Sequence, residues 1–445
     1  MANTEDTRPY ASLRYAWFVV AILMVAYVFS FVDRQILSLL VGPIRRDLGI
    51  TDTQMSLLMG FSFAIFYTVM GIPLGRLADS KSRRLLIAAG VVLWSLMTAL
   101  CGTAKVYWQM FLYRIGVGVG EAALSPAAYS MIADYFPPEK RSTALSVYGM
   151  GIYLGLGLAL VLGGLVIQFV SARGALQLPV IGMTHPWQLV FLILGGAGIV
   201  FSLAFFLVRE PPRHGMQPGA AVVPFSQVVS HLWQNRRTVL CHNYGFAMLG
   251  LVSYGAAAWI PSFFIRTWGV SPGQVGIIYG LLTMLFGCTG IVLGGRLADR
   301  WIRQDATDAA LRLGMWSAGL GMLASIAVVS VPSVIWAWIF IAPMTFFLSM
   351  PFGAAPAAIQ EIVPNQMRGQ ASAIYLFNVN LIGLGLGPTA VALLTDYLFR
   401  DDLAVRWSLL VISVVGCAGA IVLLGWGRQP YRDMVVRMRT TMSTV

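Results

Sequence analysis

Charged residues are scarce in this sequence. Asp, Glu, Lys and Arg make up 11% of its 445 residues, whereas soluble proteins carry about 25%. Hydrophobic residues make up 58%, and the mean hydropathy is +0.76. So few charges cannot form a surface in contact with water, which excludes a soluble globular protein. We expect lipid to be the solvent for most of the surface, and long apolar runs in lipid form bundled helices.

Cysteine is also scarce, and the familiar motifs of catalytic sites are missing. The four cysteines lie in or at the edges of apolar runs without a CxxC spacing, which favours small packing residues over disulfides or metal ligands: Cys101, Cys241, Cys288 and Cys417. The sequence contains no nucleophile elbow, phosphate loop or metal-ligand spacing. We therefore expect no enzyme activity, no metal site and no cofactor.

The net charge of +12 does not indicate nucleic acid binding. The basic residues are clustered in short loops between apolar runs, without a basic face on a soluble domain. Such a distribution is typical of the loops of membrane proteins. We expect the lipid bilayer and a small molecule as the partners, and a monomer.

The apolar runs predict membrane-spanning helices. A span needs about 20 apolar residues. Twelve runs meet this length, at residues 15–41, 54–77, 85–104, 106–133, 141–170, 187–208, 238–265, 273–298, 310–330, 333–360, 369–396 and 405–426.

The longest polar stretch divides these spans six and six. It covers residues 209–237 and contains two adjacent prolines, Pro211 and Pro212. The sequence therefore predicts an N-terminal six-helix bundle at 1–208, a linker at 209–237, a C-terminal six-helix bundle at 238–426 and a basic tail at 427–445. We expect the tail to lie on the membrane surface or to be disordered.

Loop charges predict the orientation. An even number of spans puts both termini on one side of the membrane. Of the 30 Lys and Arg residues, 21 fall on the side of the termini, 7 on the opposite side and 2 within spans. Cytoplasmic loops carry an excess of Lys and Arg. We therefore expect both termini and the linker to be cytoplasmic, in a multi-pass protein of the inner (plasma) membrane.

A short internal repeat indicates two homologous halves. Gly-Arg-Leu-Ala-Asp occurs at 75–79 and again at 295–299, each time after a long apolar run rich in glycine. A weaker repeat ends the fourth span of each half, Ser-Pro-Ala-Ala at 125–128 and Ala-Pro-Ala-Ala at 355–358. Two pseudo-symmetric halves that rock about a central site are the usual architecture of secondary transporters.

Four charged residues lie well inside predicted spans, away from the span ends, and all are in the first half: Asp33, Arg34, Arg114 and Glu121. Each costs about 2.5–3.5 kcal/mol at the centre of a membrane helix, which makes a functional role the default expectation. Counted from the span ends, Asp33, Arg34 and Arg114 lie at one level, roughly 13 Å below the outer edge. An ion pair between Asp33 and Arg114 is therefore expected, with Glu121 on the Arg114 face two turns deeper.

This cluster predicts proton coupling. A buried carboxylate keeps its proton unless an opposite charge holds it ionised. A motion that separates Asp33 or Glu121 from the arginines would raise its proton affinity, so the driving force would be a proton gradient. The alternative is a permanently neutralised cluster that only fixes helices together, although buried ion pairs stabilise poorly compared with apolar packing.

The repeated loops predict a cytoplasmic gate. An acidic side chain after the second span can sit at the N-terminus of a neighbouring helix, and nearby arginines can clamp across helix ends. The expected gate residues are Asp79, Arg83, Arg84, Arg76, Asp299, Arg303 and Arg141. The alternative is that these residues only determine topology.

Other polar and aromatic residues in central spans could line a substrate cavity, although each is individually typical of helix packing. Together with Arg34, Arg114 and Glu121, these substrate-binding candidates are Tyr148, Tyr153, Asn243, Tyr254, Asn378 and Asn380.

The repeated loops, the six-plus-six spans and the charged fourth span resemble the major facilitator superfamily over nearly the whole chain. Within it, the segment from Tyr113 to Glu121, with the continuation Ile132-Ala133-Asp134-Tyr135-Phe136-Pro137, resembles the Spinster lipid-transporter branch. Asp33-Arg34 also fits that branch. The compact loops suit a bacterial protein.

The resemblance implies a proton-linked transporter of lysophospholipids or sphingosine-phosphate-like amphiphiles. Asp33 and Glu121 would be protonation sites, and Arg34 and Arg114 their partners or anion contacts. The fifth span departs from the antiporter signature, because Ala159-Leu160 stands where Gly-Pro is expected, so symport and antiport both stay open. Two alternatives remain: a proton symporter of a small organic anion such as a sugar acid or aromatic acid, and a non-transporting membrane receptor on a transporter fold.

Overall fold

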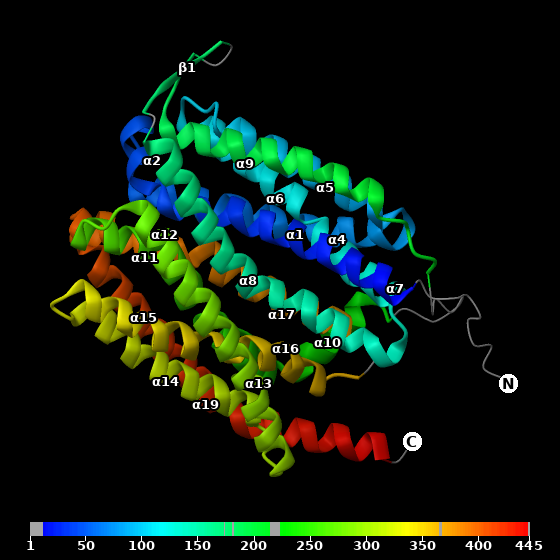
Figure 1. The fold of residues 1–445 in the computed structure, drawn as a ribbon. Helices are drawn as coiled ribbons and strands as arrows, with labels where there is room; N and C mark the ends of the chain where they lie inside the picture. Colours follow the sequence, from blue (N-terminus) through cyan, green and yellow to red (C-terminus); the bar gives the residue numbers. More distant parts are fainter. Residues whose placement is uncertain (1–11, 173, 180–181, 214–222, 365–366, 444–445) are drawn as a thin grey trace. The chain divides into compact units, whose positions relative to one another are not determined.

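The computed structural model describes residues 12–172, 174–179, 182–213, 223–364 and 367–443, and nearly all of them are helical (Figure 1). In this described part, 11 helical segments are long and apolar enough to cross a membrane. The predicted all-helical membrane architecture is confirmed. Where twelve spans were expected, the one that differs is the fourth, because its helix is interrupted.

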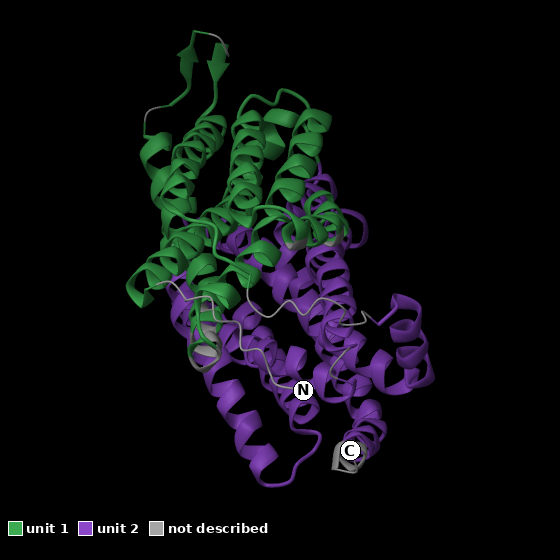
Figure 2. Cartoon of the chain, turned by 90° about the vertical axis from the view of Figure 1, so that its right-hand side faces the viewer, with its two compact units in different colours: residues 1–50, 62–220, 272–277 green, residues 51–61, 221–271, 278–445 purple. Residues whose placement is uncertain are grey.

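The residues divide into two compact units, which Figure 2 distinguishes by colour. The first comprises residues 1–50, 62–220 and 272–277, and the second comprises 51–61, 221–271 and 278–445. Each unit thus includes a short segment from the other half of the sequence. The predicted bundle boundaries at 208 and 238 stay a prediction.

The first unit contains the N-terminal helices and one hairpin. Its elements are α1 (Leu13–Leu39), α2 (Val41–Leu48), α4 (Ser62–Ser80), α5 (Arg83–Cys101), α6 (Tyr107–Glu121), α7 (Leu124–Tyr135), α8 (Pro138–Ser171), β1 (Leu176–Leu178), β2 (Gly182–Thr184), α9 (Pro186–Ser202) and the 3-10 helix η2 (Leu203–Leu207). Helix α1 packs against α8, α5 against α6 and α9, and α4 against α6. The two strands pair antiparallel, with Gln177 opposite Met183, and were not predicted.

The second unit contains the C-terminal helices and a short segment of the second span. Its elements are α3 (Asp52–Ser56), the π-helix η1 (Leu57–Phe61), α10 (Phe225–Gln234), α11 (Arg236–Trp268), η3 (Thr283–Gly287), α13 (Cys288–Arg303), α14 (Ala309–Ser330), α15 (Val334–Ser349), α16 (Pro351–Glu361), α17 (Arg368–Val379), η5 (Asn380–Leu386), α18 (Gly387–Leu393), η6 (Leu394–Phe399), η7 (Asp402–Ala404) and α19 (Val405–Ser443). Helix α12 (Pro272–Leu282) begins in the first unit and ends in the second. Helix α11 packs against α19, and α14 packs against both α15 and α19.

The fourth span is closely packed at its glycines and is interrupted just before a proline. A Cβ atom on Gly118 would lie 2.7 Å from the carbonyl oxygen of Phe63, and one on Gly120 would lie 2.7 Å from the backbone nitrogen of Trp94, so only glycine lets α6 approach α4 and α5 this closely. Pro126 lacks the N–H that would bond the carbonyl oxygen four residues earlier. Helix α6 ends at Glu121, and α7 resumes at Leu124. The break places Glu121 at a helix end inside the predicted span.

The last helix extends beyond the predicted span. Helix α19 continues past residue 426 to Ser443, so of the two expectations for the tail, disorder is wrong for the described residues and a position on the membrane surface stays a prediction. Its extension is anchored because Arg428 Nε and Arg432 Nη2 donate to Asp308, at 2.6 and 3.2 Å. Burial alone would raise the pKa of Asp308, but these hydrogen bonds and charges outweigh burial and lower it.

Candidate functional site

The four charged residues predicted inside spans meet in the first unit. Asp33 and Arg34 lie on α1, and Arg114 and Glu121 lie on α6. Asp33 is 4% exposed, and Arg114 and Glu121 are 1% exposed. The structure therefore brings these four side chains together in a buried cluster, as the sequence predicts; their roles stay a prediction.

Glu121 accepts three polar contacts on one oxygen. Ser30 Oγ donates to Glu121 Oε2 at 2.5 Å, and Arg34 Nε donates to the same oxygen at 2.6 Å. Arg34 Nη2 lies 2.6 Å from it as well. Within the described part of the chain, Glu121 Oε1 is buried and has no hydrogen-bond partner. This second oxygen can therefore take a proton without breaking the contacts of the first.

The Arg34 guanidinium is surrounded by aromatic rings. Its central carbon lies 4.5 Å from the ring centre of Phe63, 4.8 Å from that of Tyr67 and 5.3 Å from that of Phe31. A cation over aromatic faces gains about 0.5–2 kcal/mol for each good contact. The Arg34 side chain is 15% exposed, whereas that of Glu121 is fully buried. The rings therefore hold Arg34 in place, while part of its side chain stays accessible.

Arg114 contacts Asp33 differently from the expected ion pair. Arg114 Nη1 donates to the backbone carbonyl oxygen of Asp33 at 3.1 Å, and the described residues show no ion pair between the two side chains. Arg114 also lies seven residues before Glu121, about 10 Å along the helix axis. The described ion-pair partner of Glu121 is therefore Arg34, and Arg114 acts on the cluster through its contact with the Asp33 backbone.

Tyr148 belongs to the aromatic wall beside this cluster. Its ring stacks on Tyr27 with centres 5.1 Å apart and planes at 9°. Tyr27 in turn meets Phe31 edge-on at 5.1 Å, and Phe31 contacts Arg34. The other predicted substrate residue of this unit, Tyr153, is half-buried on α8.

The remaining substrate candidates lie in the second unit. The side-chain oxygen of Asn243 is 3.0 Å from Nδ1 of the buried His242, so this amide is already hydrogen-bonded within α11. Tyr254, Asn378 and Asn380 are half-buried, and Asn380 begins the π-helix η5. π-Helical turns are frequent at functional sites, and a role of these residues in substrate binding stays a prediction.

The first repeated loop contains a buried arginine. Arg83 is 0% exposed. Its Nη1 donates to Asp134 and, at 2.9 Å, to Ser130 Oγ, while its Nε donates to Glu210 Oε1 at 2.8 Å. Its Nη2 donates to the carbonyl oxygen of Pro211 at 3.0 Å. Arg83 therefore links the start of α5 to α7 and to the start of the linker.

Glu210 completes this loop cluster. Its Oε2 accepts from Ser82 Oγ at 2.8 Å and from the backbone nitrogen of Arg84 at 2.9 Å. Burial would raise the pKa of Glu210, but the hydrogen bonds from Arg84, Arg83 and Ser82 outweigh burial and lower it. Glu210 therefore stays ionised around neutral pH.

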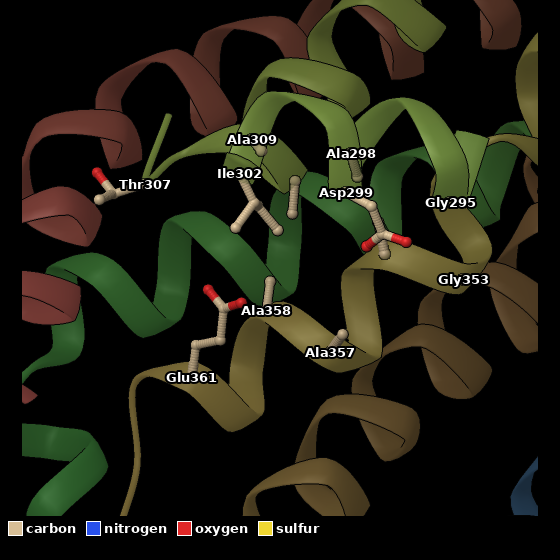
Figure 3. Close-up of a pocket in the computed structure, with 12 residues that line it drawn as sticks. Gly295, Ala298, Asp299, Ile302, Thr307, Ala309, Gly353, Ala357, Ala358 and Glu361 are labelled. Atoms are coloured by element: carbon tan, nitrogen blue, oxygen red, sulfur yellow. The ribbon is translucent and has the colours of Figure 1, made fainter. Parts of the chain in front are cut away.

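The other predicted gate residues are less constrained. Arg76, Asp299 and Arg303 are exposed. Asp299 lines a pocket of about 100 Å³ with Glu361, and Figure 3 shows these two carboxylates among the small side chains of α13 and α16. Glu361 accepts a hydrogen bond from Tyr431 Oη at 3.0 Å. The side chains of Asp79 and Arg141 lie outside the described residues.

A family model decides the identity. The model of the Major Facilitator Superfamily matches residues 23–388. This chain belongs to the major facilitator superfamily. It is therefore a multi-pass membrane transporter rather than an enzyme.

Individual relatives are also membrane transporters. An MFS-type efflux pump of Mycolicibacterium smegmatis is 32% identical over 441 residues, covering 96% of each chain. Protein spinster homolog 1 of Homo sapiens is 26% identical, covering 92% of this chain and 80% of its own length. The crystal structure of a bacterial homologue of the human lysosomal transporter Spinster, inward-facing and unoccupied, matches with a TM-score of 0.76 at 27% identity, covering 97% and 96% of the two chains. The predicted likeness to the Spinster branch is confirmed.

In this superfamily member, the start of the second span is tied to helices of the second half. Arg266 Nη1 and Nη2 bind the two carboxylate oxygens of Asp52 at 2.6 and 2.7 Å. The backbone nitrogen and Oγ1 of Thr53 donate to Asp396 Oδ2 at 2.6 and 2.7 Å. We refer to Asp52, Thr53, Arg266 and Asp396 as the outer tie, because loop charges predict that this end faces outward.

Several of these residues were not predicted. Ser30 precedes Arg34 by one helical turn and so faces the same way, which the sequence alone could have shown. Tyr67 and Phe63 look like ordinary apolar residues of a span. Glu210 and Asp52 lie outside spans, where charges are common, so nothing marks them in the sequence.

Proposed function

We propose that this protein is a proton-coupled transporter of an anionic amphiphile, a lysophospholipid or sphingosine-phosphate-like lipid, working by alternating access. The proposal includes an inner (plasma) membrane location with both termini cytoplasmic. The observation that carries it is the buried ion pair of Glu121 with Arg34. The Arg34 side chain is partly accessible, and its guanidinium is paired with the carboxylate of Glu121. One proton can neutralise that carboxylate.

The coupling follows from competition for Arg34. While Glu121 is ionised, its Oε2 occupies the guanidinium of Arg34. A proton on Oε1 removes the negative charge of Glu121 and with it the Coulomb attraction between the two groups, which weakens that contact. Arg34 can then bind the anionic group of a substrate. One proton and one anion would therefore bind together, which favours symport over antiport.

The surroundings of Arg34 favour an amphiphile over a small polar acid. Phe31, Phe63 and Tyr67 surround the cation, and the stacked rings of Tyr27 and Tyr148 extend the aromatic surface. Such a surface suits an apolar tail beside an anionic head. The similarity to Spinster proteins over nearly the full length also supports this class.

Ligand binding to the purified protein tests this proposal. We expect a lysophospholipid to bind wild-type protein more tightly as the pH falls, with uptake of one proton, and we expect Glu121→Gln to bind it equally well at all pH values. The panel should include a sugar acid, an aromatic acid and an uncharged lysolipid analogue. If a sugar acid bound more tightly than any lysolipid, the proposed substrate class would be wrong, and a small acid would be the substrate. Pronounced binding without flux in proteoliposomes would indicate a receptor.

The outer tie makes a separate prediction. Arg266→Ala should favour the outward-open state, because it removes two charge-assisted hydrogen bonds to Asp52. Spin labels on the exposed positions Arg46 and Leu403 should show a longer-distance population in the variant. Arg406→Ala serves as a control, since its guanidinium contacts Trp407 and not the tie. Identical distance distributions in wild type and Arg266→Ala would show that the tie does not hold this end closed.

A further inference from the structure

Helix α10 has three distinct faces. It lies between the two sequence halves and ends at Gln234, two residues before the long span α11 begins at Arg236. At 100° for each residue, its side chains fall into a buried sector, an exposed apolar sector and an exposed polar sector. A helix of a soluble protein needs only the first and the third.

The buried sector attaches α10 to the second unit. Val228 is 0% exposed and Leu232 is 7% exposed. Helix α10 contacts α11 and α17, and Gln370 Nε2 on α17 donates to the carbonyl oxygen of Val223, just before α10, at 2.9 Å. Helix α10 is therefore a docked element with a defined orientation.

The exposed apolar sector is a stripe of three large side chains. Phe225, Val229 and Trp233 recur every four residues and are 61%, 43% and 66% exposed. They span about 80° of the helix circumference. The polar sector beside them contains Ser226, Gln227 and Ser230, all exposed. Three exposed apolar residues in a row on a ten-residue helix need a partner that is not water.

The membrane span that follows α10 also has exposed apolar side chains near its start. Leu240 and Tyr244 on α11 are 44% and 39% exposed, as expected for side chains in contact with lipid. Between them and the stripe lie Arg236 and Arg237, both exposed. The Arg236 guanidinium carbon is 5.9 Å from the ring centre of Trp233. An apolar stripe, a tryptophan and two arginines thus occupy the boundary where a span enters the membrane.

We propose that α10 lies in the membrane interface, with Phe225, Val229 and Trp233 inserted among lipid chains, and that Arg236 and Arg237 bind the phosphates of anionic phospholipids. Amphipathic helices with aromatic residues on one face and arginines at the boundary bind membranes in this way. The lipid surface is favoured over another protein because α10 directly precedes a membrane span with exposed apolar side chains near its start and because the charges adjacent to the stripe, Arg236 and Arg237, are positive.

This inference rests on membership of the superfamily and not on the proposed substrate. Its consequence is that the segment joining the two sequence halves is attached to one leaflet. Anionic lipids would then bind at a site separate from the charged cluster, on the side of the membrane where the linker lies.

Fluorescence quenching by lipid tests the insertion. A bimane label on Val229→Cys should be quenched by lipids carrying a doxyl group near the headgroup, in nanodiscs of phosphatidylcholine and phosphatidylglycerol. The matched label on Gln227→Cys, on the polar sector, should be quenched by aqueous iodide instead. The four native cysteines are replaced by alanine in both. Iodide quenching of both labels, without lipid quenching of position 229, would overturn the proposal.

Lipid selectivity tests the arginines. In Arg236→Gln with Arg237→Gln, the enrichment of phosphatidylglycerol over phosphatidylcholine among co-purified lipids should fall by about fivefold for each arginine. Arg300→Gln, an exposed arginine on α13, should leave it unchanged. Unaltered enrichment in the double variant would contradict headgroup binding.

Light scattering distinguishes lipid from a second copy of this chain as the partner of the stripe. A dimer in wild type and a monomer in Val229→Asp, with no lipid quenching, would assign the stripe to a second copy and overturn the proposal.

Discussion

Arg34→Ala should destabilise this protein more than any other single substitution in the charged cluster. Truncation removes the only cation that contacts Glu121 directly among the described residues and leaves the fully buried carboxylate beside Ser30 alone. Breaking a buried ion pair from one side costs about 3–5 kcal/mol. The midpoint of unfolding in detergent should fall accordingly, and binding of an anionic lysolipid should be lost, because its contact is gone.

A double substitution separates the charge from the packing. Arg34→Ala with Glu121→Gln should be more stable than Arg34→Ala alone, because no buried charge remains without its partner. Glu121→Gln alone should cost little, since the amide keeps a hydrogen bond with Ser30 or Arg34. Equal unfolding midpoints for Arg34→Ala and the double variant would show that the lost contacts with Phe63 and Tyr67 matter and the ion pair does not.

Arg83→Ala should have an effect of similar size at the other end of the first unit. Arg83 is fully buried and binds Asp134, Glu210 and the carbonyl oxygen of Pro211. Its removal leaves two carboxylates without this cation, again at a cost of about 3–5 kcal/mol. Arg83→Lys should not restore stability, because one ammonium cannot contact all three acceptors in the fork geometry of a guanidinium. Arg84→Ala is the matched control, since Arg84 bonds Glu210 through its backbone nitrogen, which the variant keeps, and its side chain bonds the carbonyl oxygen of Val208 rather than a carboxylate.

The pH dependence of this effect has a defined sign. The pKa of Glu210 is lowered in the folded protein from its ordinary value of 4.5. A lowered folded-state pKa gives stability that is present above pH 4.5 and is lost as the pH falls below it. The difference in unfolding midpoint between wild type and Arg83→Ala should therefore be constant from pH 6 to pH 8 and should narrow below pH 4.5. A difference that changed between pH 6 and pH 8 would contradict this assignment of Glu210.

Much of the architecture was predictable because lipid imposes simple rules. Apolar runs of about 20 residues located the spans, and charges inside them located Asp33, Arg34, Arg114 and Glu121. The break after Glu121 was not predicted, although Pro126 follows it closely, because membrane helices also tolerate proline without ending. The end of α19 was missed because its basic extension is held by Asp308, about 120 residues away in the sequence.

The sequence predicted which residues form the charged cluster better than it predicted which of them contact each other. Asp33 and Arg34 are adjacent, so their side chains leave α1 about 100° apart, and depth counted from span ends cannot say which one faces Glu121. Aromatic contacts with Phe63 and Tyr67 hold Arg34 toward it. Helix α10 was missed for another reason: ten residues are too short for a span, and the polar linker around it hides its apolar stripe.

Proton-driven flux in proteoliposomes tests the central claim most directly. Uptake of a fluorescent lysophospholipid is measured with and without an imposed pH gradient, for wild type, Glu121→Gln and Asp33→Asn. Wild-type flux should rise with the gradient. Glu121→Gln should bind the lipid yet show no response to the gradient, because its side chain permanently resembles the protonated state, and Asp33→Asn should lose or shift the response, since neighbouring sites titrate together. Wild-type, gradient-driven flux in both variants would show that the cluster is structural and that protons do not act there.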